Sequence, residues 1–394
     1  KPTPPPTPTQ ATPTPTSPPP SHPPHASNAA SAPSHPSARK ALHPSSPIHY
    51  SKYKIVFIMG LNSSSFSWGG QVRWFGNGGE GVRMRMGEVV FSEGEGEGDV
   101  EGREGDTIEG KSQFSCLVFD NRGVGNSGYP RGPYSTSGMA QDVICLLDYI
   151  GWTAERELNV VGISLGGMIA QELASRIPHR IASLLLAVTT PGSTFPLFNL
   201  PPWSGVSSLA RLIVTPKPED KLPIVMRMVY TEKWLKERAE RIVYPGDKDN
   251  GKGVSEVQGK TNMDVQAEAF LRRASITLPQ RFLGHISQMC AGLTHHISPP
   301  KLHTLATLIP KIIILTGDVD NLVRPSGSYR LKASLDEALA EGERTGVNEK
   351  GGRVEMVLWR ETGHAIHAQR ETWFNRLVER CAVEGRLRVE RGFK

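Results

Sequence analysis

The chain has 394 residues and a formal net charge of +6, and 38% of its residues are hydrophobic. The length allows one large domain or two small ones and excludes a mini-protein that depends on disulfides. The charge does not indicate nucleic-acid binding, because Lys and Arg are interspersed with acids after residue 80 and no nucleic-acid motif occurs. No apolar run approaches the ~20 residues of a membrane-spanning helix, so we expect no transmembrane segment.

Two segments have the composition of disordered chain. The first 50 residues contain 16 of the 32 prolines and few large apolar side chains. Such a segment buries too little surface to offset its ordering entropy, so we expect a disordered proline-rich tail over residues 1–47. Residues 76–112 are rich in Gly and Glu, and their repelling carboxylates predict a disordered acidic insertion.

The rest of the chain alternates strand and helix patterns. Apolar runs predict strands over residues 54–59, 114–119, 158–163, 181–188, 311–315 and 353–359. Amphipathic segments predict helices over residues 135–150, 165–176, 326–339 and 367–383. This alternation is typical of an α/β fold, with a mostly parallel sheet flanked by helices and joined by right-handed crossovers.

Residues 191–296 interrupt this alternation. Proline-marked loops there separate amphipathic helices, near residues 222–243, 265–273 and 280–293. We expect this segment to be a helical lid inserted into the sheet domain. The core would then have a first part, residues 48–190, and a second part, residues 297–394.

The four cysteines are Cys116, Cys145, Cys290 and Cys381, and they form no CxxC pair. Their wide spacing favours reduced, structural thiols over a disulfide framework or a zinc site. We expect neither a metal nor an organic cofactor. We favour a cytoplasmic location and leave organellar targeting open, because the sequence begins at Lys1 rather than Met.

The sharpest chemical signal is the hexapeptide Gly162-Ile163-Ser164-Leu165-Gly166-Gly167. It follows a predicted strand and opens a predicted helix. A serine in so tight a turn projects above the sheet, and the free N–H groups of the helix N-terminus point at the same place. This setting favours Ser164 as a nucleophile over the alternative, a glycine-rich packing turn with a bystander serine.

At this motif the chain resembles the α/β-hydrolase fold superfamily, in its serine-nucleophile, lid-bearing branch of esterases and lipases. The likeness covers roughly residues 48–383. It rests on the stretches IMGLNSSSFSWGG (58–70), FDNRGVGNS (119–127), VVGISLGGMIAQ (160–171), and LTGDVDNLVRP (315–325) followed by ETGHAIH (361–367). Their order matches the superfamily's order of nucleophile, acid and histidine, and the resemblance therefore implies a Ser-His-Asp triad.

The resemblance also assigns the partners of the serine. His364 takes the place of the family's base, which accepts the serine proton, and His367 is the alternative. The family pattern of a glycine, two further residues and then the acid selects Asp320 over Asp318. We expect Asp318 to order its loop through backbone hydrogen bonds instead.

Two backbone N–H groups, those of Leu61 and Leu165, are implied as the oxyanion hole. The sequence Met59-Gly60 replaces the frequent His-Gly of the family, which leaves the choice between Leu61 and Asn62 open.

The other motif residues and histidines are expected to be structural. Asp120 and Arg122 can tie down neighbouring backbone, and Gly123-Val-Gly lacks the Lys-Ser/Thr of a phosphate loop. Five further histidines are expected on the surface or packed in the core: His179, His285, His295, His296 and His303. Of these, His295 and His296 could instead line a pocket beneath the lid. Apolar residues of the expected lid could line an acyl pocket, although such residues in helices more often belong to the hydrophobic core. They are Phe195, Phe198, Trp203, Met226 and Met228.

We therefore expect a serine hydrolase that cleaves a carboxylic ester or a related small-molecule acyl substrate through an acyl-enzyme. A serine nucleophile argues against epoxide hydrolase and dehalogenase chemistry, which use aspartate in this family. Acyltransferase, peptidase and carbon–carbon bond hydrolase activities share the triad and remain open. The alternative of another class is a catalytically silent interaction protein that docks through its tail and acidic insertion. The oligomeric state and the substrate's identity are not determined by the sequence.

Overall fold

The computed structural model describes residues 53–76, 114–195, 199–240, 242, 257–344 and 353–393, which all belong to the compact unit His49–Lys394. The predicted tail, residues 1–47, lies outside the described residues, as does all of the predicted acidic insertion beyond residue 76.

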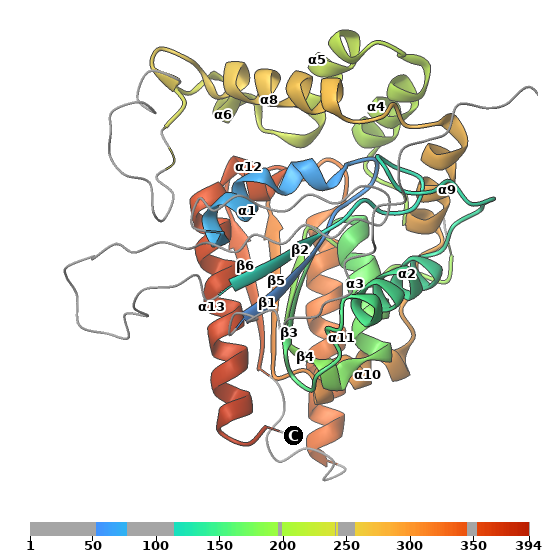
Figure 1. Ribbon diagram of the computed structural model, residues 1–394, viewed down its shortest axis with the longest axis vertical. Helices are drawn as coiled ribbons and strands as arrows, with labels where there is room; N and C mark the ends of the chain where they lie inside the picture. Colours follow the sequence, from blue (N-terminus) through green and yellow to red (C-terminus); the bar gives the residue numbers. More distant parts are fainter. Residues whose placement is uncertain are drawn as a thin grey trace, which may run out of the picture. The chain divides into compact units, whose positions relative to one another are not determined.

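A single parallel sheet forms the centre of the described chain (Figure 1). Its six strands lie in the order β2-β1-β3-β4-β5-β6, and every neighbouring pair is parallel. The strands are β1 (Tyr53–Ile58), β2 (Phe114–Val118), β3 (Leu158–Ile163), β4 (Ile181–Ala187), β5 (Lys311–Gly317) and β6 (Arg353–Trp359). The predicted α/β class with a parallel sheet flanked by helices is confirmed, and all six predicted strands are present.

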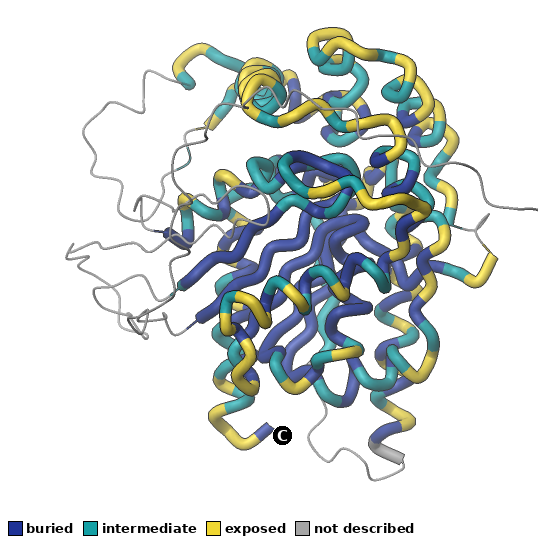
Figure 2. Tube along the Cα trace, turned by 45° about the vertical axis from the view of Figure 1, so that its right-hand side comes forward, coloured by how far each residue is buried: buried dark blue, intermediate teal, exposed yellow. Residues whose placement is uncertain are grey.

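Burial explains why these runs are strands rather than helices. Every residue of β1, β3, β4 and β5 is buried, as the continuous dark sheet in Figure 2 shows. β-branched and aliphatic side chains project to both faces of a central parallel strand, so no polar alternation is needed. The edge strand β6 is only partly buried, and Leu358 there is exposed.

Helices cover both faces of the sheet and form two separate apolar cores. One core contains side chains from α2 (Thr136–Tyr149), α3 (Leu165–Arg176), α10 (Pro299–Leu308) and α11 (Pro325–Arg344). The other contains side chains from α1 (Gly69–Phe75), α12 (Ile366–Gln369) and α13 (Glu371–Glu390). The sheet is therefore buried on both sides, and its strand ends are the places where side chains can reach solvent.

Further helices lie between β4 and α10. They are α4 (Trp203–Val214), α5 (Pro218–Val229), α6 (Glu232–Lys236), α8 (Asn262–Ile276) and α9 (Phe282–Leu293), here called the helical insertion. Backbone and side-chain contacts join it to segments that follow the carboxyl ends of β1, β2 and β6. Among the described helices, none is both long and apolar enough to cross a membrane.

The structure adds elements that the sequence patterns did not indicate. No helix was predicted between the strands at residues 54–59 and 114–119, yet a 3-10 helix (Ser65–Trp68) and then α1 lie there. The pair Gly69-Gly70 hides this helix, because glycine disfavours helices, and burial of Trp68 against Phe57 overrides that preference. The C-terminal helix was expected as one segment but is divided into α12 and α13 at Arg370. None of the four cysteines is in a disulfide bond.

Truncation of Ile313 in β5 tests the account of the core. Its side chain is fully buried, so Ile313→Ala should lower the free energy of unfolding by about 2–5 kcal/mol through lost burial and a residual cavity. The matched change Val319→Ala, at a position that is 45% exposed, should stay within about 0.5 kcal/mol of the parent. Urea denaturation measures both values, and equal losses would contradict the burial pattern.

Candidate active site

Ser164 occupies a strained turn between β3 and α3. Its φ of 56° and ψ of −122° lie where L-residues are seldom found, a conformation that costs on the order of 1–3 kcal/mol. Four hydrogen bonds hold this backbone: the Ser164 N–H donates to Ala187 O at 2.9 Å, and Ser164 O accepts from Thr189 Oγ1 and Gly167 N, each at 2.9 Å, and from Met168 N at 3.2 Å. The predicted turn is therefore present, with its serine at the N-terminus of α3.

Close packing against β1 requires glycine at position 166. A Cβ there would lie 2.0 Å from the carbonyl oxygen of Ile58, well inside van der Waals contact. The loop after β1 in turn lies against the serine, because a Cβ on Gly60 would be 3.1 Å from Ser164 Cβ and 3.6 Å from its Oγ. The first turn of α3 and the loop after β1 therefore meet at Ser164.

Asp320 and His364 form a buried pair. His364 Nδ1 lies 2.8 Å from Asp320 Oδ2 and 3.0 Å from Oδ1. The Asp320 side chain is fully buried, and its Oδ1 also accepts the N–H groups of Leu322 (2.7 Å) and Val323 (2.9 Å). These donors fix the carboxylate, which in turn orients the imidazole and leaves Nε2 for another partner.

Three strand ends supply the three predicted residues. Ser164 follows β3, Asp320 follows β5 and His364 follows β6, and parallel strands place these carboxyl ends at one edge of the sheet. Within the described residues Ser164 Oγ makes no hydrogen bond, so it is not joined directly to the Asp320–His364 pair. Hydrogen bonds of this kind are often long without substrate and tighten when it binds.

Asp318 has a different environment from Asp320. It is exposed, and its Oδ1 accepts the N–H of Thr362 at 3.3 Å, which ties the loop after β5 to the segment that precedes His364. This is the backbone role that the sequence predicted for it. Asp120 is likewise structural, since its carboxylate accepts the N–H groups of Ser65 (2.6 Å) and Asn126 (2.8 Å).

The alternative base, His367, is enclosed by aromatic rings. Its ring centroid lies 5.1 Å from that of Trp68 and 6.2 Å from that of Phe374. Burial, reinforced by the charge of Arg273, lowers the pKa of His367 to about 3. Such an imidazole stays neutral at ordinary pH, and no carboxylate among the described residues orients it, whereas His364 is oriented by Asp320.

The five remaining histidines outside the tail have varied surroundings. His179 and His296 are exposed and His303 is half-buried. His295 is buried with its Nδ1 3.0 Å from Thr136 Oγ1, and burial lowers its pKa to about 3. His285, on α9, contacts the side-chain amide of Asn62, and burial lowers its pKa below the usual value.

The backbone around the predicted oxyanion hole distinguishes Leu61 from Asn62. The N–H of Asn62 donates to Gln288 Oε1 at 2.9 Å. By contrast, the N–H groups of Leu61 and Leu165 have no hydrogen-bond partner among the described residues. Two unpaired donors therefore flank the serine, one on each of the two segments that meet there. No sequence pattern indicated Gln288, which lies 226 residues beyond Asn62.

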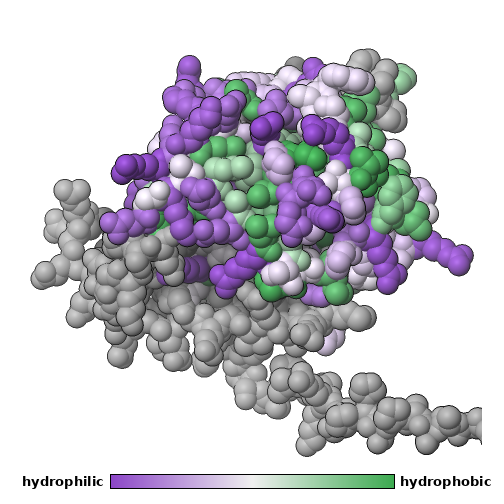
Figure 3. Space-filling view, turned by 90° about the horizontal axis from the view of Figure 1, so that it is seen from above, coloured by the Kyte–Doolittle hydropathy of each residue, from purple (hydrophilic) through white to green (hydrophobic). Residues whose placement is uncertain are grey.

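The proposed acyl-pocket residues divide into two groups. Met226 and Met228 are buried, and Met226 packs in a cluster that includes Tyr230 and Ala365, the residue after His364. Phe195 and Trp203 are exposed, whereas Phe198 lies outside the described residues. Figure 3 shows the molecule from above, the side on which Figure 1 draws α4, α5, α6 and α8, and apolar side chains lie there among polar ones.

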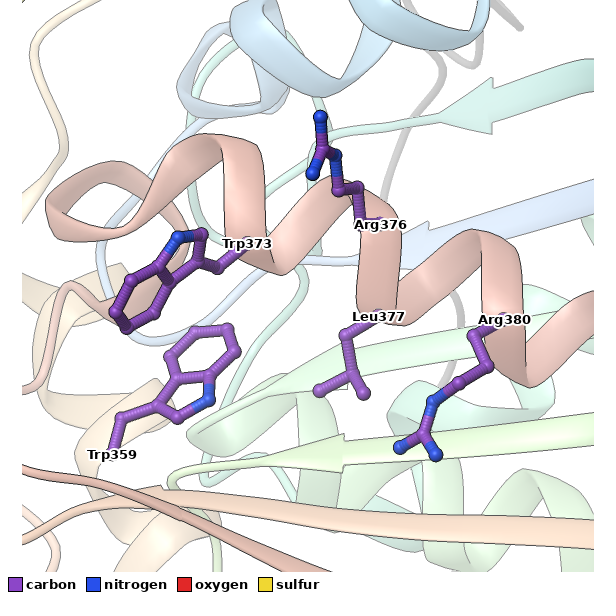
Figure 4. Close-up of a pocket in the computed structure, with 5 residues that line it drawn as sticks. All are labelled: Trp359, Trp373, Arg376, Leu377 and Arg380. Atoms are coloured by element: carbon purple, nitrogen blue, oxygen red, sulfur yellow. The ribbon is translucent and has the colours of Figure 1, made fainter. Parts of the chain in front are cut away.

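The described part of the chain shows no candidate metal site. No cluster of three or more His, Cys, Asp or Glu side chains there has the arrangement of a metal site. A surface hollow is lined by Trp359, Trp373, Arg376, Leu377 and Arg380 (Figure 4). Its lining contains none of the predicted site residues.

Comparison with known proteins agrees with this architecture. A sequence profile of the alpha/beta hydrolase fold matches residues 101–351, more than half of the chain. The chain belongs to the alpha/beta hydrolase fold family. The matched span of this alpha/beta hydrolase includes Ser164 and Asp320, and His364 lies beyond it.

Curated relatives match a shorter segment. The chain is 40% identical over 80 residues to a poly(3-hydroxyalkanoate) depolymerase of Ectopseudomonas oleovorans, which is 20% of this chain and 27% of the relative. It is 34% identical over 79 residues to 3-oxoadipate enol-lactonase 2 of Acinetobacter baylyi, 20% of this chain and 28% of the relative. The chain thus spans about a quarter of the length of the curated relatives it matches.

Solved structures share the fold over most of the chain. The enol-lactonase from Burkholderia xenovorans LB400 is similar with a TM-score of 0.52 and 17% identity, covering 84% of this chain and 92% of that one. A hydrolase from Pseudomonas aeruginosa gives a TM-score of 0.51 at 16% identity, with 83% and 88% covered. At these sequence identities the similarity shows a shared fold and nothing about substrate.

The buried histidines predict a pH dependence of stability. Unfolding returns His295 and His367 from a pKa of about 3 to 6.5, so below pH 6.5 the unfolded chain binds protons that the folded chain excludes. As the pH falls from 6.5 to 3, each histidine should lower the free energy of unfolding by up to roughly 1.4 kcal/mol per pH unit. Urea denaturation at pH values from 7 to 5 gives the free energy of unfolding as a function of pH. Its slope should be shallower for His367→Gln than for the parent, and equal to that of the parent for the exposed control His179→Gln. An unchanged slope in His367→Gln would refute the assignment.

Proposed function

We propose that the protein is a serine hydrolase that cleaves a carboxylic ester or a related acyl substrate through an acyl-enzyme. The observation that carries this proposal is the buried Asp320 carboxylate, held by two backbone N–H groups and bonded to His364 Nδ1. Burying a carboxylate is costly unless it is fully partnered, and an oriented imidazole beside it is the device that activates serine nucleophiles. Ser164, in a strained turn at the same edge of the sheet, is the nucleophile of this proposal.

The chemistry follows from the proposed roles. Ser164 Oγ attacks the acyl carbon while His364 Nε2 takes its proton, and Asp320 stabilises the imidazolium. The N–H groups of Leu61 and Leu165 bind the negative oxygen of the tetrahedral intermediate. The intermediate collapses, the leaving alkoxide takes the proton from His364, and an ester links the acyl group to Ser164. Water then attacks the acyl carbon while His364 Nε2 takes its proton. The bond to Ser164 Oγ breaks, His364 returns the proton to Oγ, and the acid leaves.

The names of the relatives support an ester substrate. A depolymerase of a poly(3-hydroxyalkanoate) and an enol-lactonase both act on compounds whose linkages are esters. We further propose that residues 191–296 act as a lid over the core formed by residues 48–190 and 297–394. The contact of Ala365 N–H with Val229 O, at 2.9 Å, joins α5 to the residue after His364 and supports this arrangement.

Labelling of the serine tests the enzyme assignment. A fluorophosphonate probe should label the folded protein, because an activated serine hydroxyl attacks the phosphorus as it would an acyl carbon. Ser164→Ala should abolish labelling and esterase activity, whereas Ser193→Ala, at a serine beyond β4, should leave both intact. Gel fluorescence and p-nitrophenyl ester hydrolysis measure these outcomes. Labelling that survives Ser164→Ala, or no labelling of the parent, would rule out the proposal.

The two neighbouring aspartates provide a matched pair for the acid. Asp320→Asn keeps the shape but removes the negative charge beside His364, and it should lower kcat by roughly 10⁴-fold. Asp318→Asn, two residues away, retains an amide oxygen for Thr362 N–H and should lower kcat less than about tenfold. Steady-state ester hydrolysis compares them, and the reverse order of effects would move the acid to Asp318.

A further inference from the structure

Helix α9 of the helical insertion contacts two loops of the core at their functional ends. It lies beside the turns that follow β1 and β2 (Figure 1), and one side chain, Gln288, bridges both. Gln288 is fully buried. A buried amide must satisfy its oxygen and its nitrogen separately, so its partners define its orientation.

The two ends of Gln288 have opposite partners. Its Oε1 accepts the Asn62 N–H at 2.9 Å, and its Nε2 donates to Arg122 O at 2.8 Å. If the amide were flipped, Nε2 would face the Asn62 N–H, donor against donor, and Oε1 would face a carbonyl oxygen. The side chain therefore acts as a spacer of one length and one polarity between the two loops.

The loop that Gln288 holds makes a left-handed turn at Asn62. The φ of Asn62 is 57°, in a region that most residues avoid and that asparagine adopts more readily than other side-chain-bearing residues. Asn62 is also contacted through its side-chain amide by His285 Nδ1, one turn earlier on α9. Contacts from α9 therefore stabilise the conformation that turns the chain directly after Leu61.

We propose that Gln288 is a positioning residue for the oxyanion hole, a role that rests on the proposed serine hydrolase function. By accepting the Asn62 N–H, it removes that donor from competition and holds the loop so that the Leu61 N–H remains free beside Ser164. An oxyanion donor acts only when it is held within a few tenths of an ångström of its target. The helical insertion thus contributes to transition-state stabilisation through a residue that does not touch the substrate.

The test compares Gln288→Met with Gln280→Met. Methionine matches the size of glutamine but lacks both polar groups. Gln280 precedes α9 and donates to Gly123 O at 2.9 Å, so its loss weakens the attachment of α9 to the turn after β2 without touching the loop after β1. In Gln288→Met, kcat for a p-nitrophenyl ester should fall on the order of tenfold to a hundredfold, less than the ~10²–10³ for complete loss of a donor. The KM should change little, because the oxyanion hole binds the carbonyl of the bound substrate much less strongly than the oxyanion of the transition state.

A second readout isolates the oxyanion. A trifluoromethyl ketone forms a tetrahedral adduct with the active serine, so its inhibition constant should rise in Gln288→Met by the same factor by which kcat falls. Burial beside the Arg122 carbonyl should keep the new carboxyl of Gln288→Glu protonated, so it still accepts the Asn62 N–H and donates to Arg122 O. This variant should retain more activity than Gln288→Met, and it also covers the case in which the methionine variant does not fold. Gln280→Met should keep the parent values of kcat and of the inhibition constant.

Several results would overturn the proposal. These are an effect on KM alone, equal losses in Gln288→Met and Gln280→Met, or a Gln288→Glu variant as impaired as a folded Gln288→Met. A parent protein that hydrolyses esters while Gln288→Met equals it would remove the role of Gln288 and leave the proposed function standing. A parent protein that neither reacts with fluorophosphonate nor hydrolyses esters would remove both.

Discussion

The close approach of α3 to β1 is the constraint on which the site depends. Gly166, in the first turn of α3, packs so tightly on the carbonyl of Ile58 that even one added carbon would collide with it. This contact brings the N-terminus of α3 against the loop that carries Leu61, and the Leu165 N–H there has no hydrogen-bond partner in the part of the chain that the structure describes. It also fixes Ser164 in a backbone conformation that an isolated turn would avoid. The strain is sustained because the Ser164 backbone is hydrogen-bonded to Ala187 and Thr189, and its neighbours Ile163 and Leu165 are buried.

The helical insertion is attached to the core at the loops that matter for the proposed chemistry. Through Gln288 it holds the loop after β1, and through Val229 O it accepts the N–H of Ala365, next to His364. Met226 and Tyr230 extend the second contact into an apolar cluster around Ala365. An insertion attached in this way holds the loops that it contacts, so we expect its packing and the geometry of the proposed site to be coupled.

The sequence predicts most of the scaffold and little of the polar network. The strands were evident because continuous apolar runs such as residues 158–163 have one stable solution, a strand buried on both faces. The pair Asp320 and His364 came from a family pattern, and the structure brings the two into contact. Helix α1 was missed because its two leading glycines suppress the helical pattern. Gln288 was missed because its meaning depends on partners 226 and 166 residues away, which no local pattern encodes.

The central claim is that Ser164 forms a covalent acyl-enzyme, and trapping that species tests it most directly. The protein is mixed with an excess of a slowly hydrolysed activated ester and quenched in acid. Its intact mass is then measured by mass spectrometry, and a digest locates the added group on a peptide. The account predicts one added acyl group per chain, located on Ser164 in the peptide that contains the turn between β3 and α3. Turnover without any adduct on Ser164, or an adduct on another residue in its place, would contradict it.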